Sequence, residues 1–338
     1  MPDMPPFPES IEVPGIARAA GAVTLDHMSD DVLGQILVDG GLFRDHLAGV
    51  VADADALVPD GAEWRIHITG DLVRSVNELD PAYATTPYTV ERGANTVAGK
   101  TVTQDDGTFD VLISSAIWNV EVSDDVEQAV GDMAARVRHT FMHEAGHVAI
   151  DARGEDALSI FPSIDSLDAF EQVWSRHLGF MLEDYRIAIA LASIAPVSES
   201  WVAMIGNDLA HFEAERARSH QVGVVQGDFG AGRDVMIEAT VHLTRALAYL
   251  SAETSDPTPH LEADDLARWH RFVAPTWPRW VETYGLATPA NEPMAADAVA
   301  DVIASLAALA PEFMRSVGFE RKMSEHGESV WWLRDFEW

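Results

Sequence analysis

Two histidines and a glutamate in FMHEAGHVAI, residues 141–150, have residue types and a spacing that suit a metal ion. His143 and His147 are four positions apart, so on a helix they lie on one face, one turn apart. Both imidazoles can then reach a single cation, at about 2 Å from each coordinating nitrogen. Glu144 lies beside them, where its carboxylate can act as a general base. The spacing HExxH therefore predicts a metal site with acid–base chemistry.

A third ligand is expected in the segment LGFMLEDYRIAIALASIA, residues 178–195, in which Glu183, Asp184 and Arg186 are the only charged residues. A helix that is apolar nearly all round is buried, and a buried carboxylate needs a cationic partner. Two acids and one arginine leave one negative charge that a metal ion would match. We predict Glu183 as the ligand because of its longer reach, with Asp184 as the alternative; Asp184 and Arg186 would then orient the ligands.

Two interpretations without a metal remain open. The motif could be a solvated helix face with two surface histidines, and the three charges of segment 178–195 could form a buried ion-pair network with the motif helix. His139 and Asp151 extend the four-residue series on either side of the motif. Three ligands at i, i+4 and i+8 of a straight helix span about 12 Å and cannot converge, so these two residues are expected to support the site or lie on the surface.

The ligand pattern resembles a known family. His143, Glu144 and His147, followed 36 positions later by Glu183, are similar to the gluzincin branch of the HExxH zinc metallopeptidases. The resemblance covers about residues 60 to 195, and its specific part is HExxH. It implies Zn²⁺ as cofactor, with His143, His147 and Glu183 as ligands and Glu144 as general base.

The metzincin branch of the same proteins does not fit. Ile150 stands where its conserved pattern has glycine, and Arg153 stands where its third ligand would be. The gluzincin resemblance implies hydrolysis of a peptide or protein substrate by a water that the metal activates. It also implies that VLISSAIW, residues 111–118, is an edge strand that binds substrate through main-chain hydrogen bonds, the alternative being an ordinary core strand.

Several features of the chemistry stay open at this point. The donor that would stabilise the oxyanion is not identified; the candidates are Tyr185, His211, His220 and His242. Two other functions compete with a peptidase: a zinc-binding scaffold without turnover, and a zinc-dependent hydrolase of a small, non-peptide molecule. A structural zinc site needs no general base, so Glu144 favours an enzyme over a scaffold.

The elements that must position these residues point to an α+β fold. Alternation of Trp64, Ile66 and Ile68 with polar residues predicts a strand. Segments 96–104 and 108–118 flank Asp-Asp-Gly at 105–107, which is typical of a hairpin. We expect the motif helix to begin at Ser123 and end near Ala152. Later helices are predicted at 166–195, 199–219, 233–253, 261–284 and 293–316. The fold class is therefore α+β, with a small antiparallel or mixed sheet followed by a mainly α-helical part. The resemblance implies that the first part is zincin-like.

We divide the chain into three segments on this basis. Residues 1–58 are an N-terminal extension with two short packing helices between 29 and 57, residues 59–195 are the zincin-like catalytic core, and residues 196–338 are a helical C-terminal domain. The glycines at 223, 227, 230 and 232 lack the lysine of a phosphate-binding loop and predict a flexible loop. The final WWLRDFEW is expected to dock onto the helices through Trp331, Trp332 and Trp338.

Charge and composition limit the partners. The chain of 338 residues has 55 acidic and 22 basic side chains and a formal net charge of -33. Nucleic acid and anionic membranes would be repelled, whereas basic peptides would be attracted. There is no cysteine, so transition-metal ligands must come from His, Asp and Glu. Neither a signal peptide nor a membrane span is predicted, and the cytoplasm is the expected location. Nothing in the sequence indicates an oligomeric state.

Overall fold

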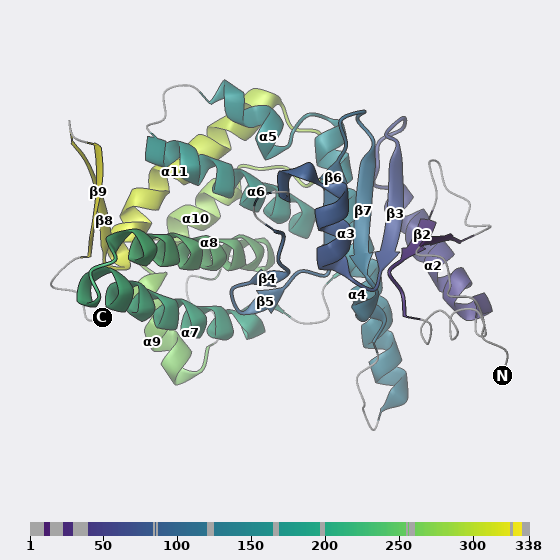
Figure 1. Ribbon diagram of the computed structural model, residues 1–338, viewed down its shortest axis with the longest axis horizontal. Coiled ribbons are helices and arrows are strands. Elements are labelled where there is room, and N and C mark those ends of the chain that lie inside the picture. Colours follow the sequence, from purple (N-terminus) through teal and green to yellow (C-terminus); the bar gives the residue numbers. More distant parts are fainter. Residues whose placement is uncertain are drawn as a thin grey trace. The chain divides into compact units, whose positions relative to one another are not determined.

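The computed structural model describes residues 10–13, 23–29, 40–83, 85, 87–119, 125–164, 169–196, 200–254, 256, 261–324 and 327–332. It divides into two compact units (Figure 1). The sheet unit lies within residues 1–91, 96–153 and 193–198, and the helical unit within residues 92–95, 154–192 and 199–338. These limits differ from the three predicted segments. The helix that carries Glu183 and Asp184, placed by prediction in the catalytic core, packs with the helical unit because its apolar surface is buried among other helices.

A five-stranded mixed sheet forms the centre of the sheet unit, in the order β1-β2-β3-β7-β6. The central pairs β2–β3 and β3–β7 are parallel, and the outer pairs β1–β2 and β7–β6 are antiparallel. Parallel neighbours need crossover connections, and helices supply them here. The strand bounds are β1 (Ser10–Glu12), β2 (Val23–Asp26), β3 (Trp64–Thr69), β6 (Gly99–Thr103) and β7 (Phe109–Ser114).

Helices cover both faces of this sheet (Figure 1). On one face, α2 (Gly40–Asp55) and α4 (Val126–Ala152) share a core with the inward side chains of β3, Trp64, Ile66 and Ile68. On the other face, α3 (Leu72–Leu79) buries Leu72 and Val76 against Leu112 of β7. The strand pattern predicted from alternation is therefore confirmed for β3, whose burial alternates at its first positions.

The helical unit has its own core, which includes the fully buried Trp174, Trp269, Trp277 and Trp280. Its long helices are α6 (Ala169–Leu191), α7 (Trp201–His220), α8 (Phe229–Glu253) and α11 (Ala296–Ser316). Shorter helices are α5 (Ala157–Ile160), α9 (Ala263–Phe272) and α10 (Trp277–Tyr284). The predicted single helix at 261–284 is wrong, because the chain turns at 273–276 and a new helix begins at Trp277, with Pro278 in its first turn.

Several boundaries differ from the predictions for local reasons. Asp125, not Ser123, caps α4 by accepting a hydrogen bond from the amide of Gln128, and Ser123 lies outside the described residues. The predicted glycine loop is short: a π-helical turn (Gln221–Val225) continues α7, and α8 begins at Phe229. A Cβ on Gly232 would lie 2.5 Å from the Cα of Gly223, so these glycines let the two helices cross closely.

Two small hairpins complete the described structure. β4 (Glu91–Arg92) pairs with β5 (Asn95–Thr96), and β8 (Phe319–Ser324) pairs with β9 (Gly327–Trp332). The indole of Trp332 donates to Ser219 Oγ at 3.0 Å and packs edge-on against Phe319, so the predicted docking of Trp332 is confirmed. Trp338 lies outside the described residues, as does the first of the two short helices expected between 29 and 57. Across the described residues, no helix combines the length and apolar character needed to cross a membrane.

The hairpin predicted around Asp-Asp-Gly is confirmed, but it gives β7 a different place from the predicted one. β6 pairs antiparallel with β7, with Gly107 at φ +83° in the connecting turn. β7 pairs with β3 on its other side, so it is an interior strand, and residues 115–118 form a 3-10 helix. The prediction of 111–118 as an edge strand is therefore wrong, and β6 lies at that end of the sheet among the described strands. Sequence alternation identifies a strand but not its neighbours.

Candidate metal centre

The HExxH sequence lies in the C-terminal half of α4, which is a regular helix throughout, as predicted. Arg136 anchors this helix to the 3-10 helix that follows β7 by donating to the carbonyl oxygens of Ile117 and Asn119. From residue 141 to residue 150 the helix is buried except for His143 and His147, which are half-buried. Their ring centroids are 5.0 Å apart with an interplanar angle of 78°. The four-residue spacing has therefore placed two imidazoles side by side on the face that is left open.

Glu144 is held by the neighbouring strand β6. Its carboxylate accepts a hydrogen bond of 2.8 Å from Thr101 Oγ1, and its side chain is almost fully buried. Gly99, two residues earlier in β6, leaves the space that the carboxylate occupies: a Cβ there would lie 2.7 Å from Glu144 Oε1. Strand β6 thus fixes the orientation of this carboxylate through one hydroxyl and one missing side chain. Neither Thr101 nor Gly99 was singled out by the sequence, because no local pattern links them to Glu144.

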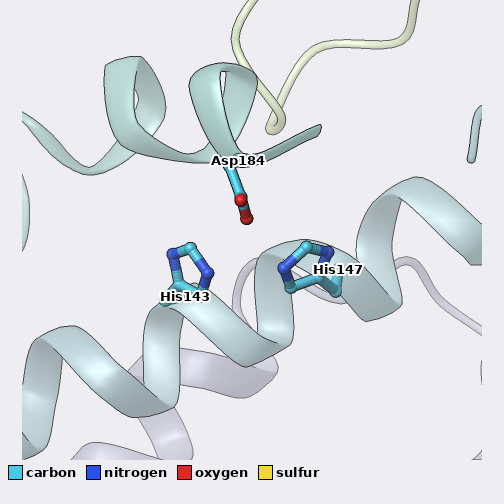
Figure 2. A group of neighbouring side chains, drawn as sticks. All are labelled: His143, His147 and Asp184. Carbon is cyan, nitrogen blue, oxygen red and sulfur yellow. The ribbon is translucent and has the colours of Figure 1, made fainter. Parts of the chain in front are cut away.

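The structure brings Asp184 to the two histidines. His143, His147 and Asp184 each offer one ligand atom, and these three atoms lie within 4.8 Å of one another. Figure 2 shows the carboxylate of Asp184 pointing toward the space between the two imidazoles. Two imidazoles and one carboxylate are ligands that zinc accepts. His143 and His147 are half-buried rather than fully exposed, so the alternative of a solvated helix face with two surface histidines fits them only in part.

Glu183, the predicted ligand, has a different role in the helical unit. Its Oε1 accepts a hydrogen bond of 2.6 Å from the backbone amide of Ala157, the first residue of α5. Consecutive residues of a helix differ by about 100° in direction, so Glu183 and Asp184 cannot face the same neighbours. Asp184, the sequence alternative, is the acid grouped with the two histidines, and Glu183, the predicted ligand, is not part of that group.

Arg186 also has other partners than the ligands it was predicted to orient. Its guanidinium donates to Glu155 Oε2 at 2.7 Å and to the carbonyl oxygen of Thr288 at 2.9 Å. Both Arg186 and Glu155 are almost fully buried. The ion pair with Glu155 connects α6 to the segment before α5, and the hydrogen bond to Thr288 connects α6 to the segment after α10. The ion pair satisfies the charge of Arg186 without either acid of its own helix.

Asp184 has a cationic neighbour on α8. Arg245 Nε lies 3.4 Å from Asp184 Oδ2, and the Asp184 side chain is 9% exposed. The sequence argument required a cation for the unmatched carboxylate, and a distant arginine supplies part of that charge. No feature of the sequence could have identified Arg245, because it is 61 residues away on a separate helix.

The two residues excluded as ligands do support α4. His139 Nδ1 donates to the carbonyl oxygen of Ala195 at 2.7 Å, and burial, followed by the charge of His143, lowers the pKa of His139 to about 4. Asp151 Oδ2 accepts a hydrogen bond of 2.9 Å from Thr103 Oγ1 of β6. Both interactions lie inside the sheet unit and hold α4 against its neighbours.

The four candidates for an oxyanion donor differ in surroundings. Tyr185 stacks on Tyr284 in the core of the helical unit, with ring centroids 4.9 Å apart, and burial raises its pKa. His220 is at the end of α7, and burial followed by the charge of Arg216 lowers its pKa. His211 on α7 and His242 on α8 both lie beside Gly93 of the β4–β5 turn. His211, His220 and His242 are all partly exposed, whereas Tyr185 is buried.

Comparison of the chain with protein families, with curated proteins and with solved structures finds no match. The chemistry of this centre therefore has to be judged from its own residues.

Proposed function

We propose that this protein is a zinc-dependent metallopeptidase that hydrolyses peptide bonds. The observation that carries the proposal is the grouping of His143, His147 and Asp184, whose ligand atoms lie within 4.8 Å of one another, with Glu144 as the residue that follows His143 on α4. Three protein ligands of this kind leave a fourth zinc position open, which is the arrangement of catalytic rather than structural zinc sites. The donors are nitrogen and oxygen atoms only, which agrees with a chain that has no cysteine.

Glu144 would do the proton chemistry. A bound zinc ion would polarise the substrate carbonyl and make a water molecule more acidic. Glu144 takes the proton from the attacking water and later delivers it to the leaving amine, which completes hydrolysis with one carboxylate. Thr101 and Gly99 keep this carboxylate in one orientation, and a fixed base transfers protons more effectively than a mobile one.

Strand β6 supports a peptide as the substrate. Among the described strands it lies at the end of the sheet, next to β7, and two of its residues lie against Glu144. A strand with one unpaired edge can bind an extended peptide by main-chain hydrogen bonds. The peptide would then run beside the proposed general base. This role replaces the one that the sequence analysis gave to residues 111–118.

The first test is the zinc affinity of a matched pair of variants, Asp184→Asn and Glu183→Gln. Each removes one charge from neighbouring positions of α6 at nearly constant shape, and glutamine can still accept the hydrogen bond from Ala157. We expect Asp184→Asn and His147→Ala to weaken zinc binding by roughly tenfold or more, and Glu183→Gln to bind like the wild type. Equal loss in Glu183→Gln and Asp184→Asn would contradict the ligand assignment, and a wild type that binds no zinc would refute the proposed function.

Turnover separates the proposal from its rivals. In the zinc-loaded protein, Glu144→Gln should keep the metal and lower peptide hydrolysis by about 100-fold or more. A zinc-loaded wild type that cleaves no member of a broad peptide library would favour the scaffold or the small-molecule hydrolase. Hydrolysis of small esters or amides but not of peptides would single out the latter.

A further inference from the structure

Arg245 has hydrogen-bonding capacity that the described structure does not use. Its Nε is a buried atom 3.4 Å from Asp184 Oδ2, and it makes no hydrogen bond within the described part of the chain. The whole side chain is 31% exposed, so the outer end of the guanidinium faces solvent. A guanidinium has five N–H donors in a rigid fork. Most of this capacity is therefore open to a ligand that approaches Asp184 from the solvent.

His242 lies close to Arg245 in the helical unit, and His211 lies close to His242. His242 is on α8 one turn before Arg245, and His211 is on α7. The β4–β5 turn meets both: a Cβ on Gly93 would lie 3.0 Å from His242 Cβ and 3.6 Å from His211 Cδ2. Burial, followed by the charges of Arg245 and Arg92, lowers the pKa of His242 to about 4. The His242 ring is therefore neutral at pH 7, and a neutral imidazole offers one N–H donor.

The acidic side chains near this group are engaged elsewhere or exposed. Glu215 Oε2 accepts a hydrogen bond of 2.8 Å from Arg218. Glu238 is 3.8 Å from His242 Nε2, and its side chain is 75% exposed. Asp208, three residues before His211, accepts a hydrogen bond from Asn95 at 3.0 Å, and burial raises its pKa to about 6. These acids leave the outer nitrogens of Arg245 accessible.

We propose that Arg245, with His211 and His242 as further donors, binds a carboxylate group of the substrate. The inference rests on the proposed function, since Asp184 beside Arg245 is the proposed zinc ligand. A carboxylate matches the guanidinium fork in shape and charge and forms two parallel hydrogen bonds with it. It would lie within one or two residues of the cleaved bond, at about 3.5 Å per residue. Local chemistry thus selects an anionic group, although the net charge of -33 favours basic peptides.

Two kinds of substrate carry such a carboxylate: a peptide with a free C-terminus, and a peptide with an internal Asp or Glu side chain. The test uses short peptides in four forms, with a C-terminal acid or amide and with an internal Glu or Gln. Binding is measured by calorimetry to zinc-loaded Glu144→Gln, which should keep the metal without turnover. We expect the form with the recognised carboxylate to bind about tenfold or more tightly than its neutral counterpart. The acid–amide and Glu–Gln comparisons show which source is recognised.

Arg245→Gln in the same background should remove this preference. Arg233→Gln is the matched control, because Arg233 lies on the same helix, is exposed and pairs only with its neighbour Asp234 among described residues. Arg245→Gln could also disturb Asp184, so bound zinc is measured in each variant. His211→Gln and His242→Gln test the site while leaving the Arg245–Asp184 pair in place. Lower preference in both histidine variants supports the site.

The outcomes separate the two proposals. A protein that binds no zinc refutes the metallopeptidase and the substrate carboxylate with it. A zinc-loaded protein with equal affinities for charged and neutral peptides refutes only the carboxylate site. A preference that survives in Arg245→Gln, His211→Gln and His242→Gln also refutes it.

Discussion

His67 should make the stability of this protein fall between pH 6.5 and pH 9. Its Nδ1 lies 2.7 Å from Asp26 Oδ2 and its Nε2 lies 3.0 Å from Asp110 Oδ1, so protonated His67 bridges β2, β3 and β7. Burial alone would lower the His67 pKa, but hydrogen bonds and charges of Asp110 and Asp26 outweigh it and raise the pKa from 6.5 to about 9. The side chain is 15% exposed, so solvent weakens these interactions little.

The sign follows from the protons bound in each state. Between pH 6.5 and 9 the folded protein keeps a proton on His67 that the unfolded chain has lost, so the free energy of unfolding falls as the pH rises. The contribution is fully present below pH 6.5 and is lost as the pH passes 9. Each pKa unit corresponds to about 1.4 kcal/mol, so the shift from 6.5 to about 9 is worth roughly 3 kcal/mol.

Urea unfolding of the wild type and of His67→Gln from pH 5 to pH 10 measures this contribution. We expect His67→Gln to be less stable than the wild type by about 3 kcal/mol at pH 6, and the difference to shrink toward zero above pH 9. Groups that titrate in both proteins cancel in this difference. His270→Gln, at an exposed position of α9, should run parallel to the wild type. A His67→Gln profile that is also parallel to the wild type would refute the charged bridge.

Two further variants test how side chains near the centre are held. Gly99→Ala puts a methyl group 2.7 Å from Glu144 Oε1, so we expect the carboxylate to move and peptide hydrolysis to fall at least tenfold. Zinc content and the unfolding midpoint should change little. Unchanged hydrolysis would contradict the role given to β6. Glu155→Gln leaves the buried guanidinium of Arg186 without its anion, so we expect the free energy of unfolding in urea to fall by about 3 kcal/mol. A loss below about 1 kcal/mol would show that the ion pair contributes little to stability.

The local structural features of this protein could be predicted from its sequence. The helix of HExxH, strand β3 and the β6–β7 hairpin depend on periodicity, capping and turn residues that lie within a few positions of one another. The same is true of the pair His143 and His147, because a four-residue step on a helix fixes their relative position. The need for a buried cation near Glu183 and Asp184 also followed from the sequence, since an apolar helix rarely buries an unmatched acid.

The choice between neighbours required the tertiary structure. Glu183 and Asp184 have the same charge and adjacent positions, and only the packing of α6 decides that one accepts the amide of Ala157 while the other faces the imidazoles. The order of the strands, which places β6 rather than β7 at the end of the sheet, depends on pairing between distant segments. Thr101 beside Glu144 and Arg245 beside Asp184 are likewise 43 and 61 residues away from their partners. Periodicity specifies which face of an element is buried, whereas the partner of that face depends on how the whole chain packs.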